Sequence, residues 1–558
     1  MIEDRLRELI GAALQAAAPE LGIDGDDLPA PELVPTKQKE HGDFATNVAL
    51  ALASRAHRSP REVAEAIRAV FPEAAFVERV EVAGPGFLNI FVTNDWLYDA
   101  LRDVVAQGSD FGRAELNGRR VQVEFVSSNP TGPLTIGHAR NAAVGDALAR
   151  LLEHAGWSVE REYYFNDAGG QMDRFGASVE ARYLQELGRV ATVPEDGYHG
   201  AYVVDFARDI LKAEGPGLGD LSPEERLARF RDLGAARAMT WIESTLERFG
   251  VRFDVYRSER DLADAGEIDD AITRLRDAGY VYDAEGAVWF RSTAFGDDKD
   301  RVVVRSNGVH TYFGADCAYV IDKFARGFDH LIYVWGADHH GDIARVKGAA
   351  QALGYDPDAV EMLIHQWVSF LRDGVPVPMG KRSGNFITLD QLMDEVGTDA
   401  ARFTLLQYSN DSAMNFDIEL VKQQTMENPV YYVQYGHARI ASILRKAEAE
   451  GVALKAIGDV DLTLLLHESE LDLLRAVAEV PSKLAAAAEL RSPHRLTHAA
   501  QDLAARFHRF YTDCRVVSED EALSQARLWL CTGTKQVLAN LLGLLGVSAP
   551  EVMERSDG

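Results

Sequence analysis

A glycine and a histidine stand at the predicted start of a helix in the stretch SSNPTGPLTIGHARNAAVGD, residues 127–146. This stretch follows the strand-like VQVEFV, passes a bend rich in Pro and Gly, and places Thr135, Gly137 and His138 where the helix begins. Helix N-termini expose unpaired N–H groups and favour anions. Gly137 lets a base or phosphate approach the backbone, and His138 can donate to a phosphate oxygen. Taken alone, the pattern leaves nucleotide binding and simple helix capping as equal alternatives.

Two further polar clusters come later in the chain. VWGADHHGD, residues 334–342, lies between a predicted strand and a predicted helix, and its alternatives are a polar turn or a metal-binding His pair. Adjacent histidines point in different directions and no third ligand stands at helical spacing, so we expect no metal held by protein side chains alone. PMGKRSGN, residues 378–385, is either a solvated loop or a mobile loop whose cations bend over an anion. Together the three clusters suit the transfer of an adenylyl group.

The elements that must position these clusters predict an α/β fold. RRVQVEFV and SVEREYYF are strand-like, and the helix between them carries Val144, Leu148, Leu151 and Leu152 on one stripe. A strand, a helix and a strand in close succession form a βαβ unit, which implies a parallel sheet. Sheet character is also predicted for RVVVRS, HTYFGAD and DHLIYVWGADHHG, and helix for the chain from about Ala400 onward.

We therefore expect three domains. Residues 1–115 predict an N-terminal α+β domain, and residues 116–400 predict a Rossmann-like parallel-sheet catalytic domain with an insertion at about 166–300. Residues 401–558 predict a C-terminal all-helical domain.

Composition limits the classes of partner. The 558 residues include 87 acidic and 58 basic side chains, a formal charge of -29, so any contact with nucleic acid must be local. The three cysteines, Cys317, Cys514 and Cys531, are far apart and form no C-x-x-C pair, which argues against a disulfide framework. The N-terminal segment reads as an amphipathic helix, and no apolar run is long enough for a membrane span. We expect a cytoplasmic protein that binds no membrane and no DNA.

The ordered motifs closely resemble the class I aminoacyl-tRNA synthetases, and among them the arginyl-tRNA synthetases. EFVSSNPTGPLTIGHARNAAVGDAL resembles the family's strand, first signature and helix, and YYFNDAGGQMDRF follows at the family's position. TYFGADCAYVIDKFARGFD and VWGADHHG resemble its amino-acid and ribose walls, and MGKRSGNFITLDQLMDEVGTDAARF its signature lysine loop. HGDFATNVALALA and VAGPGFLNI resemble its N-terminal domain, which meets the tRNA elbow, and NPVYYVQYGHARIASILRKA through LLGVSAPEVM its helical anticodon-binding domain.

The resemblance implies activation of L-arginine with ATP and Mg²⁺ to arginyl-adenylate, and transfer of the arginyl group to the terminal ribose of tRNA(Arg). It also implies that tRNA is bound before activation and that the protein is a monomer. The catalytic residues that the resemblance implies are Thr135, His138 and Lys381, and the residues that it implies bind ATP are Pro133, Gly137, His138, Gly336, Asp338, Met379 and Lys381. The residues that it implies bind arginine are Glu124, Ser127, Asn129, Tyr312, Asp316 and His339. The residues that it implies bind tRNA are Phe87, Asn89, Tyr435 and Arg439.

Structural roles are alternatives for several of these residues. Asp316 can instead serve as a helix cap or an ordinary ion-pair partner, and Tyr312 and Phe87 can pack in a core. Two whole-protein alternatives also exist. One is a relative that binds tRNA or arginine without charging, and the other is an arginine-activating enzyme of a biosynthetic pathway. Retention of the main site residues disfavours the first, and the N- and C-terminal domains disfavour the second.

Two departures from the family pattern stand out. The first signature usually reads H-x-G-H, and here Thr135 replaces its first histidine. A threonine can still donate one neutral hydrogen bond to a phosphate. The lysine loop usually reads K-M-S-K, and here only Lys381 remains of the two lysines. In some family members the second loop lysine is missing and a lysine stands just before the first signature; here that place is Gly132, and the loop keeps Lys381.

We predict that Lys381→Ala lowers the rate of amino-acid activation by about 10²-fold or more, with little change in arginine KM, because no second lysine can take over its charge. Pyrophosphate exchange measures both quantities. A variant within a factor of two of wild type would show that Lys381 takes no part in the reaction.

Overall fold

The computed structural model describes residues 2–36, 38–377, 379–380 and 385–553. The chain divides into two compact units. One comprises Met1–Phe111, Ile440–Ser482 and Ala505–Val537, and the other comprises Gly112–Arg439, Lys483–Ala504 and Leu538–Gly558. Lys381 and Pro378 lie outside the described residues.

The second unit is built on a five-stranded sheet in the order β12-β11-β5-β6-β7. Its strands are β5 (Arg120–Glu124), β6 (Ser158–Phe165), β7 (Val255–Ser258), β11 (His330–Gly336) and β12 (Val360–His365). All four neighbouring pairs are parallel, and β5 pairs with β6 on one side and β11 on the other. The prediction of a Rossmann-like parallel sheet is confirmed.

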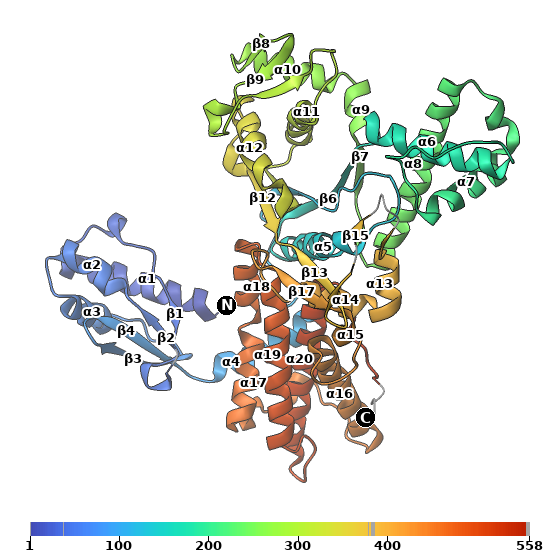
Figure 1. Cartoon of the computed structure of the whole chain (residues 1–558). Helices are drawn as coiled ribbons and strands as arrows, with labels where there is room; N and C mark the ends of the chain where they lie inside the picture. Colours follow the sequence, from blue (N-terminus) through green and yellow to red (C-terminus); the bar gives the residue numbers. More distant parts are fainter. Residues whose placement is uncertain (1, 37, 378, 381–384, 554–558) are drawn as a thin grey trace. The chain divides into compact units, whose positions relative to one another are not determined.

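Helices cover both faces of this sheet (Figure 1). α5 (Ala139–His154) connects β5 to β6, and α12 (Ile343–Ala352) connects β11 to β12. The chain leaves the centre of the sheet toward opposite edges in these two crossovers, so right-handed connections place the two helices on opposite faces. α5 packs closely because Gly145 faces Phe125, where a Cβ would lie 2.2 Å from the ring. This packing fixes the start of α5 at the carboxyl end of β5.

Two insertions interrupt the sheet. The first is a bundle of three helices, α6 (Gly169–Glu186), α7 (Ala201–Glu214) and α8 (Pro223–Arg248), which packs around a core that includes Phe175, Tyr183 and Phe230. β7 then returns to the parallel sheet. The second comprises α9 (Glu259–Asp264), α10 (Glu267–Asp277) and an antiparallel sheet of β8 (Val281–Ala284), β9 (Ala287–Phe290) and β10 (Arg301–Val304).

One predicted strand is a helix. HTYFGAD was expected to have sheet character, but Thr311 caps the start of α11 (Tyr312–Ala325), where its side chain accepts a hydrogen bond from the N–H of Gly314. The cap and the small residues that follow favour the helix over the aromatic pair that suggested a strand. This helix places Tyr312 and Asp316 one turn apart on the same face.

The chain after the parallel sheet forms β13 (Val368–Arg372), β14 (Val375–Pro376), a β15–β16 ribbon (Met379–Gly380 and Asn385–Phe386), α13 (Leu389–Val396) and α14 (Thr398–Leu405). The expectation of helix from about Ala400 onward holds except for β17 (Met414–Asp417), which pairs in parallel with β13. Phe370 on β13 packs against Phe416 on β17, and this buried contact holds the strand in place.

The first unit contains the N-terminal α+β fold. Its sheet has the order β1-β2-β4-β3, with strands Val34–Pro35, Phe44–Thr46, Phe87–Val92 and Val77–Ala83. Four helices accompany it: α1 (Ile2–Leu21), α2 (Val48–Ala56), α3 (Pro60–Ala69) and α4 (Asp95–Gln107). Residues 84–86 join β3 to β4.

The C-terminal part is helical, as predicted. After the short α15 (Ile418–Val421), its helices are α16 (Pro429–Ala449), α17 (Glu468–Ala478), α18 (Val480–Glu489), α19 (His494–Asp513) and α20 (Glu521–Leu544). None of the helices in the described part of the chain combines the length and the apolar character needed to cross a membrane.

Candidate active site

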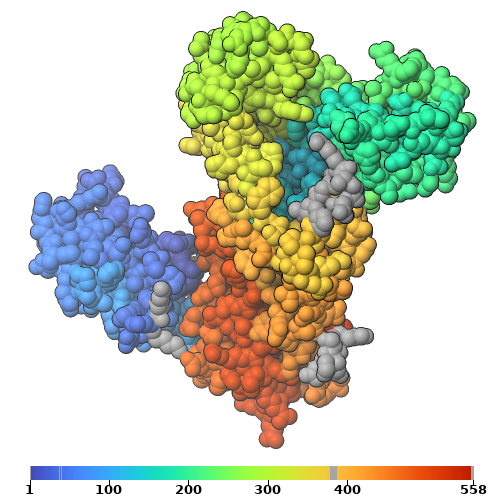
Figure 2. Space-filling model, in the orientation of Figure 1, coloured from blue at the N-terminus to red at the C-terminus, as the bar shows by residue number. Residues whose placement is uncertain are grey.

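A cavity of about 860 Å³ opens at the carboxyl ends of β5 and β11. The crossovers leave β5 and β11 in opposite directions, and open α/β sheets bind ligands at such a switch point. Figure 2 shows the place as a hollow between the yellow-green second insertion and the teal helical bundle.

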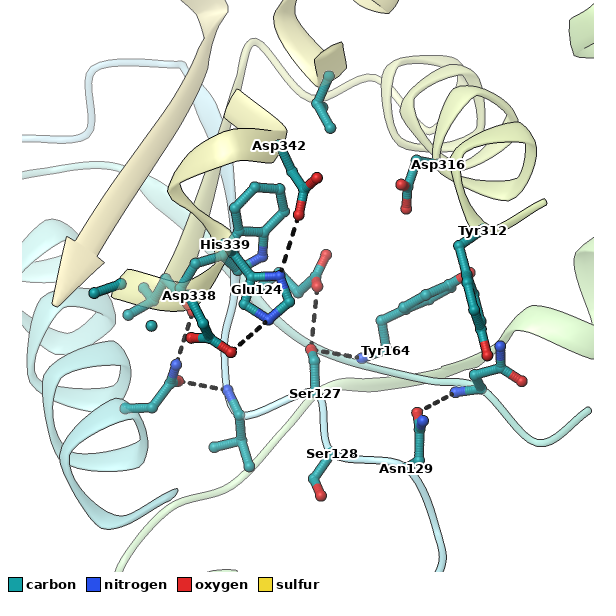
Figure 3. Close-up of a pocket in the computed structure, with 18 of the residues that line it drawn as sticks. Glu124, Ser127, Ser128, Asn129, Tyr164, Tyr312, Asp316, Asp338, His339 and Asp342 are labelled. Atoms are coloured by element: carbon teal, nitrogen blue, oxygen red, sulfur yellow. Dashed lines mark hydrogen bonds and ion pairs between the residues drawn. The ribbon is translucent and has the colours of Figure 1, made fainter. Parts of the chain in front are cut away.

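Most of the predicted site residues line this one cavity, including residues from β5, α11 and the turn after β11 (Figure 3). Those that line it are Glu124, Ser127, Asn129, Thr135, Gly137, His138, Tyr312, Asp316, Gly336, Asp338 and His339. Pro133 does not line it and is buried beneath the bend. The side chain of Met379 and the whole of Lys381 lie outside the described part of the chain. The roles given to all these residues stay predictions.

The predicted tRNA-binding residues lie elsewhere. Phe87 and Asn89 are on β4, where Phe87 is 40% exposed and Asn89 is buried. Tyr435 and Arg439 are one turn apart on α16, and the Arg439 guanidinium donates to the Tyr435 hydroxyl at 3.1 Å. Their assignment to tRNA stays a prediction.

We call residues 131–138 the signature turn. Within it the Nδ1 of His138 accepts a hydrogen bond from the N–H of Thr135 at 3.1 Å, and the Thr135 hydroxyl lies at the same distance from this nitrogen. Because Nδ1 is an acceptor, a neutral His138 ring carries its proton on Nε2. Thr135 is thus in contact with His138, and its N–H favours the tautomer in which the ring donates through Nε2.

The chain just before this turn is strained. Val126 and Ser127 have φ values of 65° and 43°, a left-handed conformation that is rare for residues other than Gly and costly for the β-branched Val126. Asn141 on α5 holds this bend, because its Oδ1 accepts from the N–H of Val126 at 2.6 Å. The Asn141 amide also donates to the carbonyl of Val334 on β11 at 2.8 Å, so one side chain ties β5, α5 and β11 together.

One wall of the cavity is acidic. Asp316 is half-buried, and no described side chain pairs with it. Burial and the charges of Glu259 and Glu124 raise the pKa of Asp316 to about 8. Burial also raises the pKa of Glu259 to about 7, although its carboxylate accepts from the Tyr164 hydroxyl at 3.0 Å and from the Asn166 amide at 2.8 Å. Two carboxyl groups with raised pKa values beside a cavity indicate a site for a cationic ligand.

The floor of the cavity holds a buried ion pair. Glu124, at the end of β5, accepts from the Nζ of Lys323 at 2.6 Å and from the hydroxyl of Ser127 at 3.1 Å. Lys323 is fully buried between the rings of Tyr319 and Tyr333, and burial lowers its pKa while Glu124 opposes that shift. The carboxylate is therefore fixed in place at the cavity.

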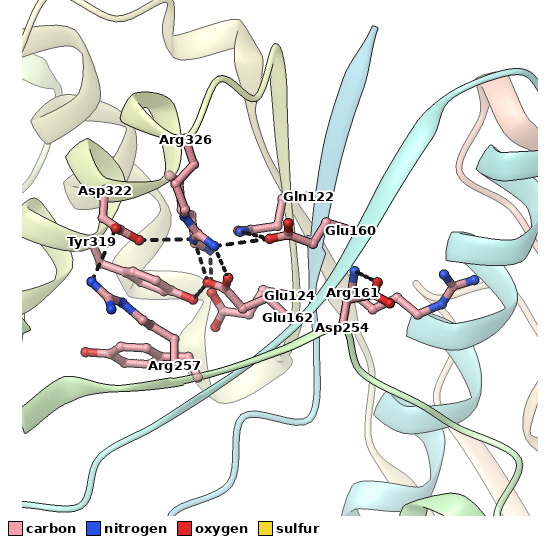
Figure 4. A network of polar contacts seen from close by, with 12 residues as sticks. Gln122, Glu124, Glu160, Arg161, Glu162, Asp254, Arg257, Tyr319, Asp322 and Arg326 are labelled. Carbon is pink, nitrogen blue, oxygen red and sulfur yellow. Dashed lines mark hydrogen bonds and ion pairs between the residues drawn. The ribbon is translucent and has the colours of Figure 1, made fainter. Parts of the chain in front are cut away.

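A second charge cluster lies next to this pair (Figure 4). The buried Glu162 on β6 accepts from the Arg326 guanidinium at 2.6 and 3.0 Å and from the Tyr319 hydroxyl. Asp322 pairs with Arg326 at 3.0 Å. Because the charges compensate one another, α11 is held against the sheet by polar contacts as well as by its apolar core.

The rim on the side of β11 is a chain of alternating charges. His339 lies 3.5 Å from Asp342 and 3.6 Å from Asp338, and the bond to Asp342 raises the pKa of His339. Asp342 also pairs with Arg345, which reaches Asp297 at 3.3 Å in the second insertion. The turn after β11 is thus fastened to the loop ahead of β10.

Several residues of this site were not predicted from the sequence. Asn141 follows His138 by one helical turn and was detectable by that spacing. Glu259 belongs to none of the quoted motifs and reaches the cavity through the packing of α9. Lys323 lies within TYFGADCAYVIDKFARGFD, but only the packing of α11 shows that it contacts Glu124. Among the described residues, no group of His, Cys, Asp or Glu side chains is arranged to hold a metal ion.

The comparisons with known proteins agree with this architecture. The family model described as "tRNA synthetases class I (R), catalytic domain" matches residues 100–195 and 222–442. The chain has the fold of a class I tRNA synthetase catalytic domain. Models described as "Arginyl tRNA synthetase N terminal domain" and "DALR anticodon binding domain" match residues 4–92 and 433–553.

Relatives that match over the whole length of the chain show which family within this class it belongs to. The chain is 47% identical to an arginine–tRNA ligase of Desulforamulus reducens over 554 residues, and this match covers 99% of each chain. It is 48% identical to one of Syntrophotalea carbinolica, over 99% of this chain and 100% of that one. The Thermus thermophilus arginyl-tRNA synthetase has the same fold, with a TM-score of 0.76 over 99% of this chain and 100% of that chain at 24% identity. This chain belongs to the arginyl-tRNA synthetase family.

Proposed function

We propose that this protein is an arginine–tRNA ligase, which activates L-arginine with ATP and transfers the arginyl group to the 3′-terminal ribose of tRNA(Arg). The observation that carries the proposal is the acidic wall of a cavity whose opposite side is a helix start. Asp316 and Glu259 supply paired carboxyl groups for a cation, and His138 supplies a donor for an anion. Arginine and ATP have these complementary charges.

The guanidinium of arginine would lie against Asp316 and Glu259. A planar guanidinium donates in a fork that matches carboxylate oxygens. Tyr312 is 60% exposed one turn from Asp316, so its ring is available to cover the guanidinium plane. Tyr164 and Asn166 hold Glu259 in place from behind.

The other end of arginine would meet Glu124 and Asn129. Glu124 is fixed by Lys323 and Ser127, and it offers a carboxylate to the α-ammonium group. Asn129 is oriented by two bonds, since its amide donates to Gln171 at 2.7 Å and its oxygen accepts from the N–H of Asn166 at 3.1 Å. These contacts turn the α-carboxylate of arginine toward the signature turn.

Activation joins two anions, because the carboxylate of arginine attacks the α-phosphate of ATP and pyrophosphate leaves. No protein nucleophile is needed. His138 donates through Nε2, the N-terminus of α5 adds a partial positive charge, and Lys381 is expected to supply a cation. Gly336 and Asp338 would take the ribose, and Mg²⁺ would arrive with ATP and neutralise its phosphates.

The remaining domains suit a tRNA acceptor. An enzyme that transferred arginine to a small molecule would have no use for the matched N-terminal and anticodon-binding domains. With a net charge of -29, the protein must contact tRNA through local groups, and we infer that it acts in the cytoplasm as a monomer. Phe87 and Tyr435 are the contacts we propose to test first.

Charging of bulk tRNA with each of the 20 amino acids tests the proposal directly. We expect arginine alone to be attached, and arginine-dependent pyrophosphate exchange to require tRNA. Asp316→Asn should raise the arginine KM by about 10²-fold, because it leaves the guanidinium without its charged partner. Attachment of a different amino acid, or exchange that ignores arginine, would refute the assignment.

Arginine affinity should rise with pH. The pKa values of about 8 for Asp316 and about 7 for Glu259 mean that both groups are largely protonated at pH 6. Arginine binds their ionised forms and must expel these protons, so its affinity should increase by at least about 10-fold between pH 6 and 8.5. Calorimetric titration in buffers of different ionisation enthalpy counts the released protons. An affinity that stays flat over this range would contradict the acidic wall as the arginine site, and Asp316→Asn should flatten the profile.

His138 and Thr135 should contribute unequally. His138→Ala removes the donor at the helix start and should lower the exchange rate by about 10²-fold. Thr135→Ala removes only a hydroxyl beside Nδ1, while the backbone N–H still holds the ring, so the loss should be about 5-fold. Thr135→Ser keeps the hydroxyl and serves as the matched control. Equal losses for the two alanine variants would give Thr135 a catalytic contact of its own.

A further inference from the structure

The helical bundle of α6, α7 and α8 contacts the signature turn from two sides. One contact is direct, and the other passes through residues 386–390, the segment that begins α13. None of the bundle residues involved lines the cavity. These bundle residues can therefore act on the reaction only through the position of the turn.

The direct contact is made by Tyr202 on α7. Its hydroxyl donates to the carbonyl of Thr131 at 2.9 Å, and the side chain is buried. Its ring lies against Gly132, whose φ is 142° and where a Cβ would come within 2.7 Å of the ring. A side chain at residue 132 would therefore clash with the Tyr202 ring.

The indirect contact is made by Asp390 in the first turn of α13. Its carboxylate accepts from the Trp241 indole at 3.0 Å, from the Thr245 hydroxyl at 2.7 Å and from the Arg248 guanidinium at 2.7 Å. All three donors are on α8. A carboxylate with three donors from one helix fastens the start of α13 to the bundle.

The start of α13 is paired in turn with the signature turn. The N–H of Ile136 donates to the carbonyl of Ile387 at 3.1 Å, and the N–H of Leu389 donates to the carbonyl of Leu134 at 2.9 Å. Thr135 and Thr388 face each other in this short antiparallel bridge. The residue that contacts His138 is therefore bracketed by two backbone hydrogen bonds.

Aromatic rings fill the space between the two contacts. The ring of Tyr202 packs edge-on against Trp241 at 6.3 Å and against Phe386 at 6.4 Å between centroids. The bundle, the signature turn and the start of α13 thus share one buried contact, and in Figure 1 the bundle lies beside β15 and α13. A shift of the bundle must move both backbone segments together.

We propose that the helical bundle sets the position of His138, with Tyr202 and Asp390 as its positioning residues. The inference rests on the proposed function, because it assigns these residues to the activation step. A donor misplaced by about 1 Å loses much of its effect on a transition state while still allowing substrates to bind. The expected defect is therefore in kcat and not in the arginine KM.

Two pairs of variants in the full-length protein test this. Tyr202→Phe removes only the hydroxyl, and its control is Tyr183→Phe, which removes a hydroxyl from a buried side chain of α6 that donates to the carbonyl of Gly215. Asp390→Asn weakens the three-donor contact, and its control is Asp394→Asn, an exposed carboxylate that pairs with Arg248. Each variant is assayed for kcat and for both KM values in pyrophosphate exchange, for Tm, and for hydrogen exchange of peptides that cover 134–138 and 387–390.

We expect Tyr202→Phe to lower kcat by about 5-fold and Asp390→Asn by about 10-fold, with the arginine KM within a factor of two of wild type. Hydrogen exchange should become faster in both peptides, because Ile136 and Leu389 donate the bonds that join them. Both control variants should keep the wild-type kcat and exchange pattern.

The inference is wrong if the test variants keep the wild-type kcat, or if each control lowers kcat as much as its partner variant. It is also wrong if Tm falls without a change in kcat per folded molecule, since the contacts would then be structural only. Wild-type protein that fails to charge tRNA with arginine would refute the proposed function instead, and the hydrogen-exchange result would still decide whether the bundle holds the turn.

Discussion

The divergence of the chain at β5 and β11 is the constraint on which the rest of the structure depends. Parallel strands need crossover connections, and connections that leave adjacent strands toward opposite edges open a crevice at their carboxyl ends. Glu124 and the strained Val126–Ser127 bend end β5 there, and Gly336 ends β11. Asn141 holds the crevice together because it bonds to both strands from the first turn of α5. The helix start and the acidic wall then face each other across one cavity.

Charge separation across this cavity explains how one site serves a cationic amino acid and an anionic nucleotide. Burial raises the pKa of Asp316 and of Glu259, and a guanidinium placed beside them would favour their ionised forms. Lys323 pairs with Glu124 from below and opposes its charge at the floor. The opposite side carries the His138 donor and the N-terminus of α5, where negative charge grows during activation.

The sequence predicted the fold better than it predicted the site. The βαβ unit could be predicted because its strands are rich in β-branched residues and the apolar residues of α5 recur at helical spacing. Gly156, in a left-handed conformation, follows the end of this helix. The prediction of a strand at HTYFGAD was wrong because it relied on the aromatic residues, which are common in strands. Thr311 instead caps the start of a helix. Motif residues such as His138 and Asp316 could be placed by resemblance, and the structure gathers them in one cavity. Glu259, Lys323 and Tyr202 were missed because their roles arise from contacts between elements far apart in sequence.

The central claim is that arginine and ATP lie across the cavity with the guanidinium on the acidic wall and the reacting phosphate at the signature turn. A crystal structure of the protein with a non-hydrolysable arginyl-adenylate analogue measures this most directly. The account predicts that the guanidinium lies within hydrogen-bonding distance of Asp316 and Glu259, with the phosphate mimic against Nε2 of His138. A guanidinium bound away from both carboxylates, or a phosphate mimic that makes no contact with His138, would contradict it.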